Sequence, residues 1–268
     1  MAQEVGAFPV FVPFAIMKAM PTPTSKARPL RCVTLGDGPA LVLLHGYAMQ
    51  PETYLPLARL LADRARVVIP AIFALPERWS FDHALECLEL TVDDQGIDRM
   101  SLLGHSFGGG LELAFASRHP ERVVECVFSD TLADRREFRL AQEALRNPPR
   151  LLGMASVPAA EAFFKSLVTH PVQLVRAAWW GFTSDRSEDI ETIVAERIPC
   201  HVLWAERDSI LLRSDGQAFA RDLHATFTVA KRPPGYGRID HDWMFDDPEL
   251  FVAHLEELGL QVLSKSAA

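Results

Sequence analysis

Ser106 stands in the pattern Gly-x-Ser-x-Gly, within "LLGHSFGGG" at residues 102–110, directly after an apolar run. A serine on a tight turn between a strand and a helix stands clear of the sheet, and the glycines on either side, Gly104 and Gly108, leave room for the neighbouring backbone. Once a base takes its proton, such a hydroxyl can attack a carbonyl carbon. The pattern predicts that Ser106 is a nucleophile; the alternative is a glycine-rich turn that packs against a helix.

Six histidines follow Ser106 in the chain, and one of them could serve as its base. Five fall in or at the ends of predicted helices and strands, or in a predicted insertion. His241, in "GYGRIDHDWMFDDPE", occupies a loop after the last predicted strand and before a helix, where it could reach over the strand ends. We predict that His241 is the base; the alternative is a capping or surface histidine beside Asp240 and Asp242.

An acid is needed to orient the imidazole and to stabilise its charged form. In this type of sheet the order along the chain is serine, acid, histidine. Asp208 directly follows the apolar run "CHVLWAE" and is the predicted acid. The alternative is Asp130, at the end of the run "VVECVFSD", which could equally be the N-cap of a following helix.

Attack on a carbonyl carbon turns the carbonyl oxygen of the substrate into a negatively charged oxyanion. The oxyanion needs two N–H donors, and one of them is the N–H of Phe107, the residue after the serine. The second donor is predicted to be the N–H of Tyr47, in the loop "LLHGYAMQ". In this loop Gly46 allows a sharp turn, and His45 could brace the backbone through hydrogen bonds.

Strands alternating with helices must position these residues. Continuous apolar runs predict buried strands at 40–46, 65–70, 99–104, 123–130, 200–206 and 225–230. Helical spacing predicts helices at 51–64, 80–96, 111–119 and 248–260, with Ser80 as an N-cap and Gly96 after a C-terminus. The helix after Ser106 is predicted to pack closely through Gly109 and Gly110. This alternation is typical of an α/β fold with a doubly wound, mostly parallel sheet.

Between residues 132 and 198 no run resembles a buried strand, and the spacing of apolar residues is helical. We therefore expect an N-terminal arm and linker (1–27), a core in two parts (28–131 and 199–268) and a helical insertion (132–198). Five aromatic residues of the insertion could line an apolar acyl pocket or pack its own core: Phe163, Phe164, Trp179, Trp180 and Phe182.

The 268 residues carry a formal net charge of −8, which argues against binding to nucleic acid. Four cysteines lie far apart, so that neither a zinc site nor a disulfide framework is expected, and buried thiols in a cytoplasmic protein are the better interpretation. The apolar segment 5–20 is preceded by Glu4 and lacks the basic start of a signal peptide. We expect it to pack on the body; the alternative is a contact with a membrane surface or a homodimer partner.

Taken together, four segments resemble the α/β-hydrolase fold superfamily over residues 28–265: "LVLLHGY", "SLLGHSFGGG", "CHVLWAERDSIL" and "DHDWMFDDPELFVAHLEEL". The resemblance implies an eight-stranded, mostly parallel sheet, a helical cap after the sixth strand, and a triad of Ser106, Asp208 and His241. Two features differ from many relatives: "AIFALPERW" lacks a glycine-rich turn, and Asp240 precedes the histidine where a glycine is common. A serine at the elbow argues against dehalogenase or epoxide hydrolase chemistry, which such relatives perform through an aspartate.

The predicted function is a serine hydrolase, of carboxylesterase or lipase type, that acts on a small-molecule carboxylic ester or related acyl substrate. It would require no metal and no organic cofactor. Two alternatives remain: perhydrolysis or carbon–carbon bond hydrolysis by the same triad, and a non-catalytic small-molecule receptor on the same fold.

Overall fold

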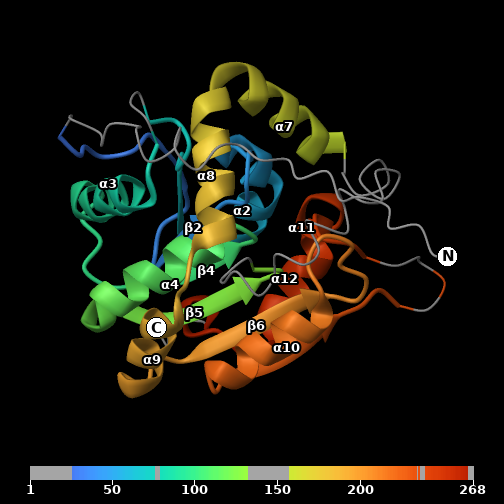
Figure 1. Cartoon of the computed structure of the whole chain (residues 1–268). Coiled ribbons are helices and arrows are strands. Elements are labelled where there is room, and N and C mark those ends of the chain that lie inside the picture. Colours follow the sequence, from blue (N-terminus) through green and yellow to red (C-terminus); the bar gives the residue numbers. More distant parts are fainter. Residues whose placement is uncertain (1–25, 76–78, 132–156, 234, 236–238, 265–268) are drawn as a thin grey trace, which may run out of the picture.

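The computed structural model describes residues 26–75, 79–131, 157–233, 235 and 239–264 (Figure 1). These residues contain a seven-stranded sheet in the order β1-β3-β2-β4-β5-β6-β7. Its strands are β1 (Cys32–Leu35), β2 (Ala40–Leu44), β3 (Arg66–Pro70), β4 (Met100–His105), β5 (Val123–Ser129), β6 (Cys200–Ala205) and β7 (Thr226–Ala230). β1 runs antiparallel to β3, and every other neighbouring pair is parallel. The mostly parallel, doubly wound fold is confirmed, with seven strands in the described residues where the resemblance implied eight.

Helices cover both faces of this sheet (Figure 1). They are η1 (Pro51–Tyr54), α2 (Leu55–Leu61), α3 (Phe81–Asp94), α4 (Gly108–Arg118), η2 (Pro120–Arg122), α7 (Val157–Thr169), α8 (Pro171–Thr183), α9 (Ser187–Ala195), α10 (Arg213–Asp222), α11 (Trp243–Asp246), α12 (Pro248–Glu257) and η4 (Gln261–Leu263). Ser80 caps α3 by accepting a hydrogen bond from the N–H of His83, and Gly96 follows the helix with a φ of 64°, as predicted.

Two buried apolar clusters fill the space between sheet and helices. One joins Val42 and Leu44 to residues of α3, α4, α9 and α10. The other joins Leu41 and Leu43 to residues of α2, α11 and α12. Since successive side chains of a strand point to opposite faces, β2 is buried on both sides, and this explains its continuous apolar sequence.

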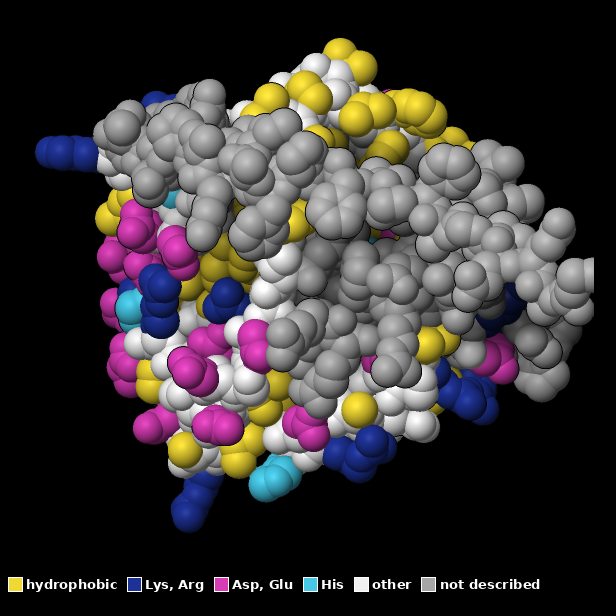
Figure 2. Space-filling view, viewed as in Figure 1, with side chains coloured by type: hydrophobic (Ala, Val, Ile, Leu, Met, Phe, Trp, Pro, Cys, Tyr) yellow, Lys and Arg dark blue, Asp and Glu magenta, His cyan; other side chains and the backbone are white. Residues whose placement is uncertain are grey.

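Between β5 and β6 the described residues form the helices α7, α8 and α9. The predicted helical stretch breaks at Pro171, which takes the first position of α8. Figure 2 shows apolar side chains gathered over α7; the exposed apolar residues of α7 and α8 are Val157, Phe163, Phe164, Leu167, Val168, Val172 and Val175. The arm at residues 1–25 and the first part of the insertion, 132–156, fall outside the described residues, so the domain boundaries stay a prediction.

The described residues include no helix with the length and apolar character that crossing a membrane requires. The four cysteines are free: Cys87, Cys126 and Cys200 are buried, whereas Cys32 is partly exposed.

α4 packs tightly against the sheet. A Cβ added at Gly109 would overlap the side chain of Thr131, which agrees with the predicted close packing of this helix. Glu112 of α4 is fully buried, and its Oε1 accepts a hydrogen bond from the N–H of Val127, at 3.0 Å. Burial raises the pKa of the Glu112 carboxyl well above its ordinary value. The folded protein therefore binds a proton at Glu112 more tightly than the unfolded chain does.

Replacing Glu112 with glutamine is expected to make stability less dependent on pH. With a raised pKa in the folded state, the wild-type carboxyl contributes stability below its unfolded pKa and loses it as pH rises, by up to about 1.4 kcal/mol per pH unit. Urea unfolding at pH 6 and pH 8 would measure this: the wild-type protein should lose more free energy of unfolding than the Glu112→Gln variant between the two values. An equal loss in both proteins would contradict a protonated Glu112.

Candidate active site

Ser106 occupies the sharp turn between β4 and α4. Its φ of 51° lies in the left-handed region, which is strained for a residue with a side chain. A Cβ added at Gly104 would lie 2.6 Å from the Cα of Gly109, and one added at Gly108 would overlap the carbonyl oxygen of Leu44. The glycines on either side of Ser106 thus provide the space that the sequence pattern predicts.

His241 lies in the loop before α11, and its ring is hydrogen-bonded to Asp208. The distance from Nδ1 of His241 to Oδ2 of Asp208 is 2.9 Å, and both side chains are buried. Oδ1 of Asp208 accepts hydrogen bonds from the N–H groups of Ile210 (2.8 Å) and Leu211 (2.7 Å), which fix the carboxylate. Burial lowers the pKa of His241, but the charge and hydrogen bond of Asp208 outweigh it, so the net shift is upward. The ring of His241 is therefore suited to accept a proton, and the carboxylate of Asp208 is suited to stabilise the imidazolium that results.

Asp240 joins the loop of the acid to the loop of the base. Its Oδ1 accepts hydrogen bonds from the N–H (2.7 Å) and Oγ (2.6 Å) of Ser209 and from the N–H of His241 (2.8 Å). The aspartate that replaces the common glycine therefore has a structural role beside the histidine.

Asp130, the alternative acid, is hydrogen-bonded to groups other than the ring of His241. Its Oδ1 accepts a hydrogen bond from the N–H of Ala205 (2.7 Å), and its Oδ2 accepts from Nε1 of Trp243 (2.9 Å) and Oγ of Ser129 (3.0 Å). Burial raises the pKa of Asp130 well above its ordinary value. Of the two candidate acids, Asp208 is the one hydrogen-bonded to the ring of His241.

The loop after β2 is braced by His45, as predicted. The N–H of Ile72 donates to Nε2 of His45 at 3.1 Å, so Nδ1 carries the proton and donates to the carbonyl of Gly46, also at 3.1 Å. Burial lowers the pKa of His45 to about 4, which keeps the ring neutral.

This loop lies against the serine turn. A Cβ added at Gly46 would lie 3.4 Å from the Cβ of Ser106. Neither the N–H of Tyr47 nor that of Phe107 has a hydrogen-bond acceptor within the part of the chain that the structure describes. Two free N–H groups beside the serine are what an oxyanion requires.

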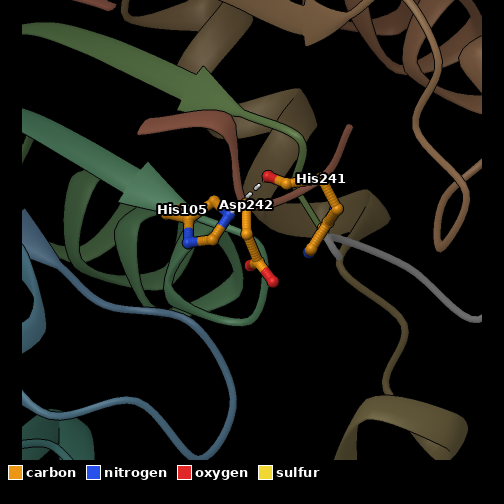
Figure 3. A group of neighbouring side chains, drawn as sticks. All are labelled: His105, His241 and Asp242. Carbon is orange, nitrogen blue, oxygen red and sulfur yellow. Dashed lines mark hydrogen bonds between the residues drawn. The ribbon is translucent and has the colours of Figure 1, made fainter. Parts of the chain in front are cut away.

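A buried network that the sequence does not reveal connects the two loops. The N–H of Gly46 donates to Oη of Tyr54 (2.8 Å), which lies 2.7 Å from Nδ1 of His105. Nε2 of His105 lies 3.3 Å from the carbonyl oxygen of His241 (Figure 3). Because a carbonyl only accepts, Nε2 carries the proton and Nδ1 accepts from Tyr54. Burial and the neighbouring His241 hold the pKa of His105 well below its ordinary value, which keeps this tautomer neutral.

Replacing Tyr54 with phenylalanine is expected to lower kcat roughly tenfold and stability by about 1–3 kcal/mol, because the N–H of Gly46 and a nitrogen of His105 lose their buried partner. Steady-state kinetics and urea unfolding would measure both. Thr91→Val is a matched control: this buried hydroxyl also accepts from an N–H, that of Leu30, and donates to the carbonyl of Cys87. The Thr91→Val variant should lower the free energy of unfolding and leave kcat unchanged. An equal effect on kcat in the two variants would contradict a role of the network in the active site.

Five aromatic residues of the insertion could line a pocket or pack its own core, and among those described Trp180 contacts the serine turn. Trp180 of α8 stacks on Phe81, with centroids 4.0 Å apart, and meets the ring of Phe107 edge-on at 5.1 Å. Phe164 is 66% exposed and lies largely in solvent, whereas Phe163 is 39% exposed and therefore more than half covered. The side chain of Phe182 falls outside the described residues.

Among the residues that the structure describes, two groups of side chains bring metal-ligating atoms within 4.8 Å of one another: His105, His241 and Asp242 (Figure 3), and Asp130, Asp208 and His241. In the first, both nitrogens of His105 already have hydrogen-bond partners. In the second, His241 and Asp208 bind each other. Because these atoms already form hydrogen bonds within the protein, the two groups are better suited to proton transfer than to binding a metal ion.

Comparison with known proteins gives consistent results. A family model described as alpha/beta hydrolase fold matches residues 39–210. A putative non-heme haloperoxidase of Mycobacterium phage D29 is 28% identical over 258 residues, which cover 85% of this chain and 89% of that protein. A fluoroacetate dehalogenase of Burkholderia sp is 30% identical over 114 residues, 38% of each chain.

Among solved structures, a thermophilic esterase from Thermogutta terrifontis superposes with a TM-score of 0.66 at 21% identity, covering 88% of this chain and 94% of that one. The fold is therefore shared over most of both chains.

Proposed function

Because the chain belongs to the alpha/beta hydrolase fold family, we propose that it is a serine hydrolase that cleaves carboxylic esters or related acyl compounds. The observation that carries this proposal is the hydrogen bond of 2.9 Å between His241 and Asp208, on loops that meet the turn of Ser106 through His105. In this proposal Ser106 is the nucleophile, His241 the base and Asp208 the acid. The contact of His105, which directly precedes Ser106, with the carbonyl oxygen of His241 supports it.

In the proposed mechanism Ser106 attacks the carbonyl carbon of the substrate while His241 takes the proton of the hydroxyl. Asp208 holds the ring and stabilises its positive charge. The N–H groups of Tyr47 and Phe107 donate to the oxyanion. His241 then gives its proton to the leaving alcohol, and water, activated by the same histidine, releases the acid from Ser106.

We also propose that residues 132–198 form a cap over this site. The contact of Trp180 with Phe107 supports the proposal, since it links α8 to the residue that follows the nucleophile.

A second candidate is perhydrolysis, in which hydrogen peroxide replaces water and a peroxyacid is released. The similarity to a putative non-heme haloperoxidase over 85% of the chain favours this candidate. The two reactions share the acyl-enzyme, and measuring the peroxyacid formed from acetate or acetate esters in the presence of peroxide separates them.

Hydrolysis and perhydrolysis share one step, the nucleophilic attack of Ser106. Labelling with a fluorophosphonate probe tests this step. We expect the folded protein to be labelled, the heat-denatured protein not to be, and peptide mass spectrometry to find the adduct on Ser106. Folded protein that resists labelling would exclude an activated serine and favour a non-catalytic receptor. Screening p-nitrophenyl esters by acyl length, with lactones and thioesters, would then define the substrate.

A further inference from the structure

A further carboxylate, that of Asp242, lies in the candidate active site and takes no part in the proposed mechanism. Asp242 directly follows His241 and precedes α11, and it is only 8% exposed. One of its oxygens lies within 4.8 Å of ring nitrogens of both His241 and His105. Figure 3 shows its carboxylate beside the two rings.

Asp242 differs from the neighbouring buried aspartates in its hydrogen bonds. Asp130, Asp208 and Asp240 each accept three hydrogen bonds. No donor to the carboxylate of Asp242 is found among the described residues, and as the residue before α11 its side chain caps no helix N–H. Its oxygens are not among the fully buried side-chain atoms that lack a partner in the described residues, so they are open to solvent and not sealed in the core. A carboxylate that is open in this way beside the proposed base can accept a hydrogen bond from a substrate.

The charge of Asp242 is retained at neutral pH. Burial raises its pKa to about 6, so most molecules carry the ionised form at pH 7 or above. An ionised carboxylate accepts hydrogen bonds and attracts positive charge, and it donates none. Its best partner is a protonated amine, which supplies N–H donors and the opposite charge together.

We propose that Asp242 binds a protonated amine on the substrate, so that the enzyme prefers amino-substituted esters to neutral ones. This inference rests on the proposed hydrolase function and narrows it to a substrate class. Because the carboxylate lies close to the ring of His241, which exchanges its proton with the nucleophile, the amine would stand only a few bonds from the ester carbonyl.

Two pairs of esters of matched shape test the proposal. On the alcohol side, 2-(dimethylamino)ethyl acetate is compared with 3-methylbutyl acetate. On the acyl side, the ethyl ester of dimethylglycine is compared with ethyl 3-methylbutanoate. In each pair a protonated nitrogen replaces a CH group. We expect kcat/KM to favour the cationic member in at least one pair.

The variant Asp242→Asn should reduce that preference roughly ten- to a hundredfold, as expected for loss of one charge-assisted hydrogen bond. The ratio of kcat/KM between the two members is the readout, because a change in the pKa of His241 alters both rates together. Asp246→Asn is the matched control: it removes the same charge at an exposed position four residues further along, at the end of α11, and should leave the ratio unchanged.

A ratio that stays the same in Asp242→Asn, with both rates lowered equally, would overturn the proposal and leave Asp242 with an effect on His241 alone. Wild-type protein that hydrolyses the neutral ester as well as its cationic match in both pairs would also overturn it. Either result leaves the hydrolase function intact. Failure of that function would show differently, as absence of labelling at Ser106 and of hydrolysis of every ester.

Discussion

Replacing Ser106 with alanine is expected to lower kcat for ester hydrolysis by roughly 10⁵- to 10⁶-fold. The substitution removes the nucleophile but leaves the hydrogen bond between His241 and Asp208, so the remaining groups can still bind the substrate. Since alanine is smaller than serine and the turn already has its positive φ, no large change in structure is expected.

Single-turnover and steady-state kinetics would measure the loss, and binding of an unreactive ketone analogue would show whether the site is intact. Ser214→Ala provides a control at an exposed position of α10 and should keep full activity. Residual activity of the Ser106→Ala variant above 1% of wild type would assign the reaction to another nucleophile.

Replacing Asp208 with asparagine is expected to lower kcat roughly 10³- to 10⁴-fold, because an amide neither fixes the tautomer of His241 nor stabilises its positive charge. Asp130→Asn is the informative comparison. It is also a buried aspartate of this region, but its oxygens bind Ala205, Trp243 and Ser129. We expect it to reduce kcat far less than Asp208→Asn; the reverse order would make Asp130 the acid.

The pH dependence of kcat/KM gives an independent test of the same pair. His241 must be neutral to accept the proton of Ser106, so activity falls as pH drops through its pKa. Asp208 raises that pKa in the folded protein, so the acidic limb should lie above the ordinary histidine value. Removing the charge of Asp208 should move the limb to lower pH in the residual activity. A limb that stays in place would mean that another group controls the profile.

Much of the fold was predictable because its strands are buried on both faces. β2, β4 and β5 read as continuous apolar runs, and each was placed within two residues of its observed bounds. β1 was missed. Its four residues at the edge of the sheet are not buried: three are partly exposed and Thr34 is exposed. β1 pairs on one side only, with β3, so no apolar run marks it.

The residues of the candidate site also divide into those that a sequence pattern marks and those that it does not. The positions of Ser106 on a tight turn after β4 and of His241 in the loop before α11 were predictable, because a sequence pattern and a place after the last strand single them out. Asp208 and Asp130 remained alternatives, since each follows a buried strand and only their hydrogen bonds separate them. Tyr54 and His105 carried no signal: their contact joins positions 51 residues apart, and His105 occupies a position that the serine pattern leaves free.

The three hydrogen bonds of Asp240 have a consequence for the speed of the reaction. They join the loop of Asp208 to the loop of His241 in the protein without substrate, so the backbone that carries the imidazole is already held in place. If the proposed mechanism holds, the entropy of fixing this segment is lost once, during folding, rather than in every turnover. The proposed pair would thus be preorganised.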